Sequence, residues 1–281
     1  MRCLKTGFTI LLFILGTATA YGDEVKTATI TGRLAAKSGA PLADAYVYLF
    51  NQAMGPAPDA TKYWRVPDEI VQADQSGSFT AQIPHGTYYL GAIKRVTGKD
   101  VGPPVAGDYF LDISTENGHP RMYLFNRERI DVGLIDEGQP FNPATIADMK
   151  GVTAIEGKVV NADGKPAAGV SVFAFLSASM VGRPLFSSDK TGSDGKFLLR
   201  VAKGGTYFLK AREDYGGGPP KLGGLIGYYG EHAALPIGVA SGKIVQGIKV
   251  VVSPFPGQGG KPVQGRQSPA MPPGMRLNPV P

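Results

Sequence analysis

Three histidines are the residues best suited to acid–base chemistry in this chain, and their spacing assembles no site. They are His85, His119 and His232, and no two of them lie at a spacing that would let both bind one metal ion. The chain also has no Gly-x-Ser-x-Gly sequence, the turn that exposes a serine nucleophile in many hydrolases. We expect loop histidines exposed to solvent, no catalytic residue, no metal site and no cofactor.

Carboxylates cluster at predicted turns, at Asp74, Asp163, Asp189 and Asp194. Aspartate is common in turns because its side chain accepts hydrogen bonds from nearby backbone N–H groups. Asp189 and Asp194 could alternatively contribute to a calcium site at a loop edge, although calcium requires several converging oxygens. We expect turn capping, with calcium binding as the alternative.

Aromatic residues are the more informative candidates for binding. Tyr63 precedes Trp64, the one tryptophan, in a long Pro-containing segment between two predicted strands. Such a pair could form a platform for a sugar ring or an extended peptide, or Trp64 could fold back over a sheet edge or the core. Tyr109-Phe110 and Tyr228-Tyr229 present the same choice. The candidate ligand-binding residues are therefore Tyr63, Trp64, Tyr109, Tyr228 and Tyr229.

The elements that position these residues are predicted to be β-strands. Between positions 155 and 211, β-branched and aromatic residues form short runs bounded by turn residues, with no run of helical period. Asp163-Gly164 and Asp194-Gly195 stand between such runs, where glycine permits the positive φ of a tight turn. From Gly205 an alternating strand places Tyr207, Leu209 and Ala211 on one face.

The same pattern occurs earlier in the chain. Ile30, Gly32, Gly39, Pro41, Val47 and Phe50 each match a residue 125 positions later, and the match resumes between Gly77–Ala92 and Gly195–Ala211. Apolar, glycine and proline positions agree in register, so we predict two copies of one module. Each copy continues through a Gly/Pro-rich excursion and an aromatic pair to a last strand, marked by Ile130, Val132 and Leu134 or by Ile244, Ile248 and Val250.

The two ends of the chain differ from the body. Residues 1–20 combine basic Arg2 and Lys5, an apolar run too short to span a bilayer, and a small-x-small end at Ala20, as in a secretory signal peptide. The one cysteine, Cys3, lies inside this segment, so a mature chain would have no disulfide. Residues 254–281 are rich in Pro, Gly and Gln, and we expect a disordered tail.

Charge does not predict a nucleic-acid-binding face. Five of the 29 basic residues lie in the two end segments, which contain none of the 23 acidic residues, so the body carries a net charge of only +1. We divide the chain into a signal peptide at 1–20, a module at 25–136, a linker at 137–150 with a helical turn after Pro143, a second module at 151–253, and the tail.

The modules resemble the carboxypeptidase regulatory-like domain, a transthyretin-like or prealbumin-like sandwich related to the B-type repeats of bacterial surface adhesins. The matching residues are Ile155-x-Gly157-x-Val159, Asp163-Gly164-Lys165-Pro166, Val170-x-Val172, Asp194-Gly195-x-Phe197 and Gly205-Thr206-Tyr207. The resemblance implies an all-β protein of two tandem seven-stranded Greek-key sandwiches. It also implies a stabilising or binding role, because such domains are typically non-catalytic.

The sequence thus leads to two hypotheses of different classes. The first is a non-catalytic exported scaffold, periplasmic or extracellular, that binds a protein partner through its sheet edges and has no integral membrane segment after signal cleavage. The second is a carbohydrate-binding protein that holds a polysaccharide with Tyr63 and Trp64. A transthyretin-like hydrolase is a remote third, since the Tyr-Arg-Gly-Ser ending of that family is absent.

Overall fold

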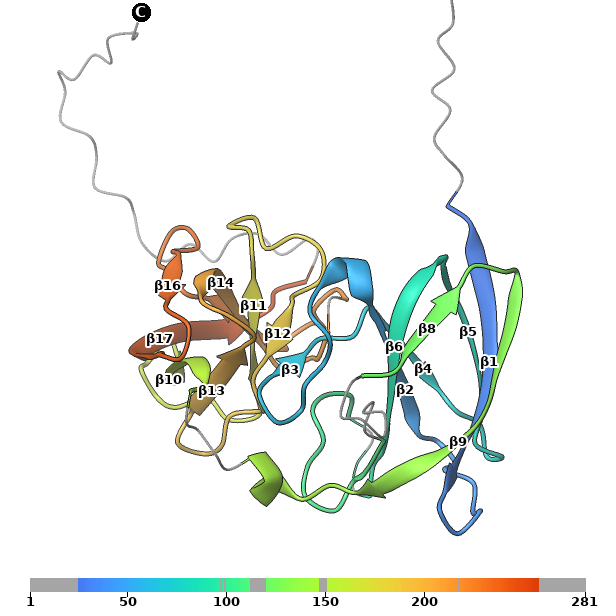
Figure 1. Ribbon diagram of the computed structural model, residues 1–281. Coiled ribbons are helices and arrows are strands. Elements are labelled where there is room, and N and C mark those ends of the chain that lie inside the picture. Colours follow the sequence, from blue (N-terminus) through green and yellow to red (C-terminus); the bar gives the residue numbers. More distant parts are fainter. Residues whose placement is uncertain are drawn as a thin grey trace, which may run out of the picture.

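A computed structural model describes residues 25–96, 98, 100–111, 120–146, 151–216 and 218–257. The predicted signal peptide, His119 and nearly all of the predicted tail lie outside these residues. Apart from two short 3-10 turns, the regular secondary structure of the described residues is all β-strand, which confirms the all-β prediction. Figure 1 shows two sandwich modules side by side, module 1 built from β1, β2 and β4 to β9, and module 2 built from β10 to β17.

Module 1 wraps two layers around one core. One layer contains β4, β2, β6 and β8, the other contains β5, β1 and β9, and β7 pairs with both β6 and the end of β9. The strands are β1 (Thr27–Ala36), β2 (Tyr46–Asn51), β4 (Glu69–Gln72), β5 (Ser78–Pro84), β6 (Gly86–Lys94), β7 (Tyr109–Leu111), β8 (Met122–Phe125) and β9 (Arg129–Pro140).

Module 2 repeats this arrangement strand for strand. Its first strand pairs in parallel with its last strand, as β1 does with β9. It also pairs antiparallel with its fourth strand, as β1 does with β5. The strands are β10 (Thr153–Asn161), β11 (Ser171–Phe175), β12 (Phe186–Ser187), β13 (Lys196–Val201), β14 (Gly205–Arg212), β15 (Leu225–Tyr228), β16 (Ile237–Val239) and β17 (Ile244–Pro254). The equivalent pairing supports the predicted repeat.

The two modules also share their turns and hydrogen bonds. Gly39 and Gly164 both have positive φ, and the bridges Ala35–Pro41 and Val160–Pro166 close the same turn 125 residues apart. The Tyr88 hydroxyl donates to the Pro84 carbonyl over 3.0 Å, as that of Tyr207 does to Lys203 over 2.8 Å.

The strand count differs from the seven expected. Each described module has eight strands, because two short strands pair with different parts of the same edge of one long strand. In module 1, β6 pairs with β8 through residues 86–89 and with β7 through residues 92–94; β14 pairs with β16 and β15 in the same way.

Strand β9 continues to Pro140, into the segment 137–150 that we interpret as a linker, since residues 139 and 140 pair with β7. A 3-10 turn, η2 (Pro143–Ile146), confirms the helical turn after Pro143. Strand β17 likewise reaches Pro254, one residue into the predicted tail. Among the described residues, no helix is long and apolar enough to span a membrane.

Candidate functional site: the strap and the groove between the modules

The modules are joined by a segment that the repeat does not explain. Residues 52–68, which we call the strap, leave module 1 after β2 and return at β4. They contain η1 (Gln52–Met54) and β3 (Trp64–Arg65). Strand β3 pairs antiparallel with β12 and so extends the sheet of module 2, as Figure 1 shows. Val66 N–H also donates to the Leu185 carbonyl over 3.0 Å.

Tyr63 belongs to the core of module 2 although it lies in the sequence of module 1. Its side chain is 7% exposed and meets Phe186 edge to face at 5.2 Å between ring centroids. Its hydroxyl donates to the Ala57 carbonyl over 2.6 Å, and burial raises the pKa of Tyr63 to about 12. An aromatic side chain buried this way typically stabilises a fold by about 3–5 kcal/mol.

Trp64 is 8% exposed and lies between the modules. The Arg200 guanidinium stands over its indole ring at 5.4 Å, and Phe141 contacts it at 6.0 Å between centroids. Of the two alternatives for Tyr63-Trp64, the structure has the second: the pair folds back against a sheet edge and a core and forms no exposed platform. The reason is that β12 is a short edge strand whose backbone groups β3 satisfies.

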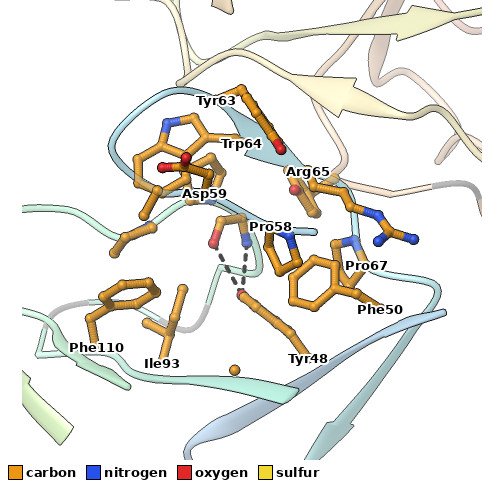
Figure 2. Close-up of a pocket in the computed structure, with 16 residues that line it drawn as sticks. Tyr48, Phe50, Pro58, Asp59, Tyr63, Trp64, Arg65, Pro67, Ile93 and Phe110 are labelled. Carbon is orange, nitrogen blue, oxygen red and sulfur yellow. Dashed lines mark hydrogen bonds between the residues drawn. The ribbon is translucent and has the colours of Figure 1, made fainter. Parts of the chain in front are cut away.

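Arg65 joins the two ends of the strap by hydrogen bonds. Its buried guanidinium donates to the carbonyls of Asn51, over 2.5 Å, and Pro56, over 2.6 Å, and to the Asp68 carboxylate, over 3.0 Å. Asp68 also accepts from the Asn51 N–H over 2.6 Å. These bonds join both ends of the strap, and Figure 2 shows Arg65 beside Phe50 and Pro67.

The sheet faces on either side of the strap are apolar. Tyr48 and Phe50 project from β2, and the equivalent Phe173 and Phe175 project from β11, so these strands are buried on both faces. In a solvated sandwich the outer face would be polar. The faces meet through the strap and Tyr215, which contacts Phe173 at 5.4 Å between centroids.

The loop of module 1 that follows β6 is held by hydrogen bonds from two side chains, Arg95 and Tyr48. Arg95 donates to the carbonyls of Asp100, Gly102 and Pro103, and over 2.5 Å to the buried Asp108 carboxylate. The Tyr48 hydroxyl donates to the Gly102 carbonyl over 3.0 Å and accepts from the Gly102 N–H over 3.3 Å, as the dashed lines in Figure 2 show. Because these donors bind the backbone of Asp100, Gly102 and Pro103 directly, this part of the loop is held in place.

Between this loop and module 2 runs an open groove in two parts. The first, of about 470 Å³, is lined by Trp64, Pro103, Pro104, Phe141, Ser171 and Asp189, among others. The second, of about 430 Å³, is lined by Arg212, Asp214, Pro219 and Lys221 and shares Asp100, Lys190 and Tyr215 with the first. A smaller cavity of about 50 Å³ lies under the strap, between Tyr63, Phe110 and Tyr215. Volumes of several hundred Å³ are typical of small-molecule sites.

The charges along the groove are largely matched. Lys190 of module 2 pairs with Asp100 of module 1 at 2.6 Å, which lowers the pKa of Asp100. Burial raises the pKa of Asp189, although the residue keeps an exposed surface, and the positive charge of Arg200 opposes that rise. Burial in turn lowers the pKa of Arg200. The groove therefore presents polar groups without a strong net charge.

The other aromatic candidates are half-buried, and the two pairs are not equivalent. Phe110 pairs with Ile93, whose counterpart Arg212 pairs with Ile226 and not with Tyr229. The sequence match at these pairs is thus shifted by three residues, because the excursions before them differ in length. Tyr109 and Tyr229 pack against the module cores, and Tyr228 packs against the cluster of Phe173 and Phe175 on the outer face of β11.

The remaining polar candidates assemble no site within the described residues. His85 and His232 lie in different modules, and the described part of the chain holds no group of three His, Cys, Asp or Glu side chains able to bind one metal ion. Asp74 accepts from the N–H groups of Ser76 and Ser78, and Asp194 from Lys196, which confirms turn capping at these two aspartates.

Arg65, Arg95, Ser171 and Arg200 were not predicted from the sequence. A signal for the interface existed: residues 46–50 and 171–175 read as apolar on both faces rather than alternating, which indicates a strand covered on both sides.

No protein-family model matches this chain, and no curated protein matches it significantly. Solved structures match at low identity: the Bacillus anthracis TIE protein (11% identity, 82% of this chain and 34% of that chain, TM-score 0.26), a streptococcal ancillary pilin (12%, 83% and 64%, 0.24) and the minor pilin of Streptococcus agalactiae (16%, 83% and 100%, 0.23). The chain thus spans about a third of the first and under two thirds of the second. At these scores the matches bear on no function of this chain.

Proposed function

We propose that this chain is an exported, non-catalytic scaffold whose two carboxypeptidase regulatory-like modules act as one rigid unit and bind a protein partner at the cell envelope or outside the cell. The observation that carries the proposal is the strap: β3 completes the sheet of module 2 and Tyr63 its core. A tether between independent binding modules would need neither contact.

Rigidity suits a spacer or platform more than a flexible linker between binding sites. Contacts between domains of one chain are usually small and polar, so relative motion is the ordinary expectation. Here strand β3 and the core residue Tyr63 join the strap of module 1 to module 2, and Arg65 holds the two ends of the strap together. A rigid unit of this kind would keep the spacing of the outer sheet edges constant.

Rotational diffusion tests the rigid unit. Backbone ¹⁵N relaxation of the full chain should give one correlation time for both modules. Replacing residues 57–65 with a Gly-Ser segment of equal length should give two shorter ones, while a replacement of the exposed turn residues 37–39 should change nothing. Two independent correlation times in the wild type would contradict the proposal.

Fractionation of cells that express the full chain tests export and assembly. The protein should be recovered outside the cytoplasm beginning at Tyr21, and an amine-directed cross-linker should join it to one stoichiometric protein. A cytoplasmic chain that keeps Met1 would disprove the export proposal. A purified protein that turns over ester or peptide substrates would disprove the non-catalytic one.

A further inference from the structure

The two modules differ at one pair of equivalent positions beside the first part of the groove. Tyr46 of β2 corresponds to Ser171 of β11, 125 residues later, in the row that continues with the aromatic residues Phe173 and Phe175. A hydroxymethyl group thus takes the place of a phenol ring, and Ser171 lines the groove of about 470 Å³.

We propose that this groove binds one uncharged saccharide unit of monosaccharide or disaccharide size through Ser171 and Asp189, with Trp64 beside the Asp189 carboxylate. The proposal does not depend on export or on a protein partner. It also differs from the platform considered in the sequence analysis, because the indole directs its N–H at Asp189 instead of offering an exposed face for stacking.

One buried hydroxyl at the groove has no hydrogen-bond partner among the described residues. The Ser171 side chain is 1% exposed, and its Oγ makes no hydrogen bond there. The Trp64 N–H, by contrast, faces the Asp189 carboxylate and lowers the pKa of that carboxyl, although the geometry of this contact is not that of an ordinary hydrogen bond. Buried polar groups in native proteins are nearly always paired, so the unpaired Ser171 hydroxyl beside a groove indicates a polar occupant.

The groups that line the first part of the groove fit hydroxyls better than ions. The Asp189 carboxylate accepts hydrogen bonds and the Ser171 hydroxyl can accept or donate, which matches vicinal hydroxyls that donate and accept together. The two cationic residues that line this part are already paired, Arg95 with Asp108 and Lys190 with Asp100, and Asp189 has the positive charge of Arg200 beside it. An anionic ligand would therefore have to displace a carboxylate, and a cationic one would meet the charge of Arg200.

The remaining walls fit the apolar faces of a sugar ring. Pro103, Pro104 and Phe141 lie on the module 1 side, and Tyr215 on the module 2 side. Small-molecule sites commonly combine mostly apolar walls with a few polar groups that fix orientation. The loop that carries the two prolines is held by Arg95, so its wall exists before a ligand binds.

Calorimetric and ligand-observed NMR titration of the mature chain tests the proposal. The probes are glucose, galactose, mannose, N-acetylglucosamine, cellobiose and chitobiose, each to 10 mM. At least one should saturate, and Ser171→Ala and Asp189→Asn should each weaken it tenfold or more. Ser253→Ala and Asp163→Asn, which change exposed residues away from the groove, should leave binding unchanged.

The stability of the free variant supplies a second, independent readout. Since the Ser171 hydroxyl has no partner in the described protein, Ser171→Ala should melt at or above the wild-type temperature. A marked drop in its melting temperature would show that the hydroxyl is already bonded within the protein and would overturn the proposal. So would saturation by none of the probes, or binding unaltered by both groove variants.

Discussion

Strands β4 and β12 occupy equivalent positions, and they end their sheets differently. Strand β4 pairs only with β2 within the described residues, whereas β12 pairs with β11 and also with β3, which comes from module 1. Module 1 thus completes its core with its own residues, and module 2 takes Tyr63 from its neighbour. The core of module 2 therefore depends on module 1, whereas the described core of module 1 contains no residue of module 2.

The largest test of this asymmetry is Tyr63→Ala. Removing a buried aromatic ring and leaving a cavity should cost module 2 about 3–5 kcal/mol. Tyr123→Ala, which loses a stacked contact with Phe125 in module 1, is the matched control and should lower the stability of module 1 instead. Hydrogen exchange resolves the modules; equal protection of module 2 in wild type and Tyr63→Ala would contradict one-way dependence.

Arg65→Met should have the next largest effect. Methionine keeps much of the side-chain volume but leaves Asp68 without its ionic partner and three carbonyls without a donor, at a cost of about 3 kcal/mol. Urea unfolding followed by Trp64 fluorescence measures it. Lys62→Met, which removes an exposed ion pair with Asp59, should change the unfolding midpoint little. Equal losses of stability in both variants would mean that the hydrogen bonds of Arg65 do not stabilise the strap.

Two carboxyls should respond to pH with opposite signs. Burial raises the pKa of Asp68 above its ordinary 3.8, against the Asn51 N–H and Arg65. Its contribution is therefore fully present below the unfolded pKa and is lost as pH rises through the folded one. Hydrogen bonds from Ser76 and Ser78 lower the pKa of Asp74, whose contribution is present above 3.8 and lost as pH falls.

Urea unfolding between pH 2 and 6 measures both signs. The stability of wild type relative to Asp68→Asn should fall as pH rises, and relative to Asp74→Asn it should fall as pH drops. Carboxyl ¹³C titration gives the two pKa values directly. A common sign for both residues would show that the strap carboxyl is as well solvated as the turn carboxyl.

Lys190→Ala should have the smallest effect. The Lys190–Asp100 pair joins the modules, but both side chains keep substantial exposure, so its loss should cost about 0.5 kcal/mol or less and vanish at high salt. Thermal melts at low and high ionic strength check this. A loss comparable to that of Tyr63→Ala would mean that surface charge, and not the strap, holds the modules together.

Local patterns were sufficient for most of the fold. Glycine at positions 39 and 164 predicts a tight turn, because positive φ costs it no steric clash, and the alternation at Tyr207, Leu209 and Ala211 predicts the buried face that the structure has. The repeat followed because equal spacing of such residues requires equal turns and strands. Leu134 is an exception: a bulge near Gly133 changes the alternation in β9, and the side chain is exposed.

The sequence by itself determined the β-strand patterns and the core residues that each module takes from its own strands, since side-chain period and turn chemistry are local properties. Only the tertiary structure decided where the strap goes. Residues 63 and 64 show the same aromatic pair whether they face solvent, cover their own module or enter the next one. That choice depends on the free edge of β12, which lies more than a hundred residues away. Neither segment alone contains the information that the two strands pair.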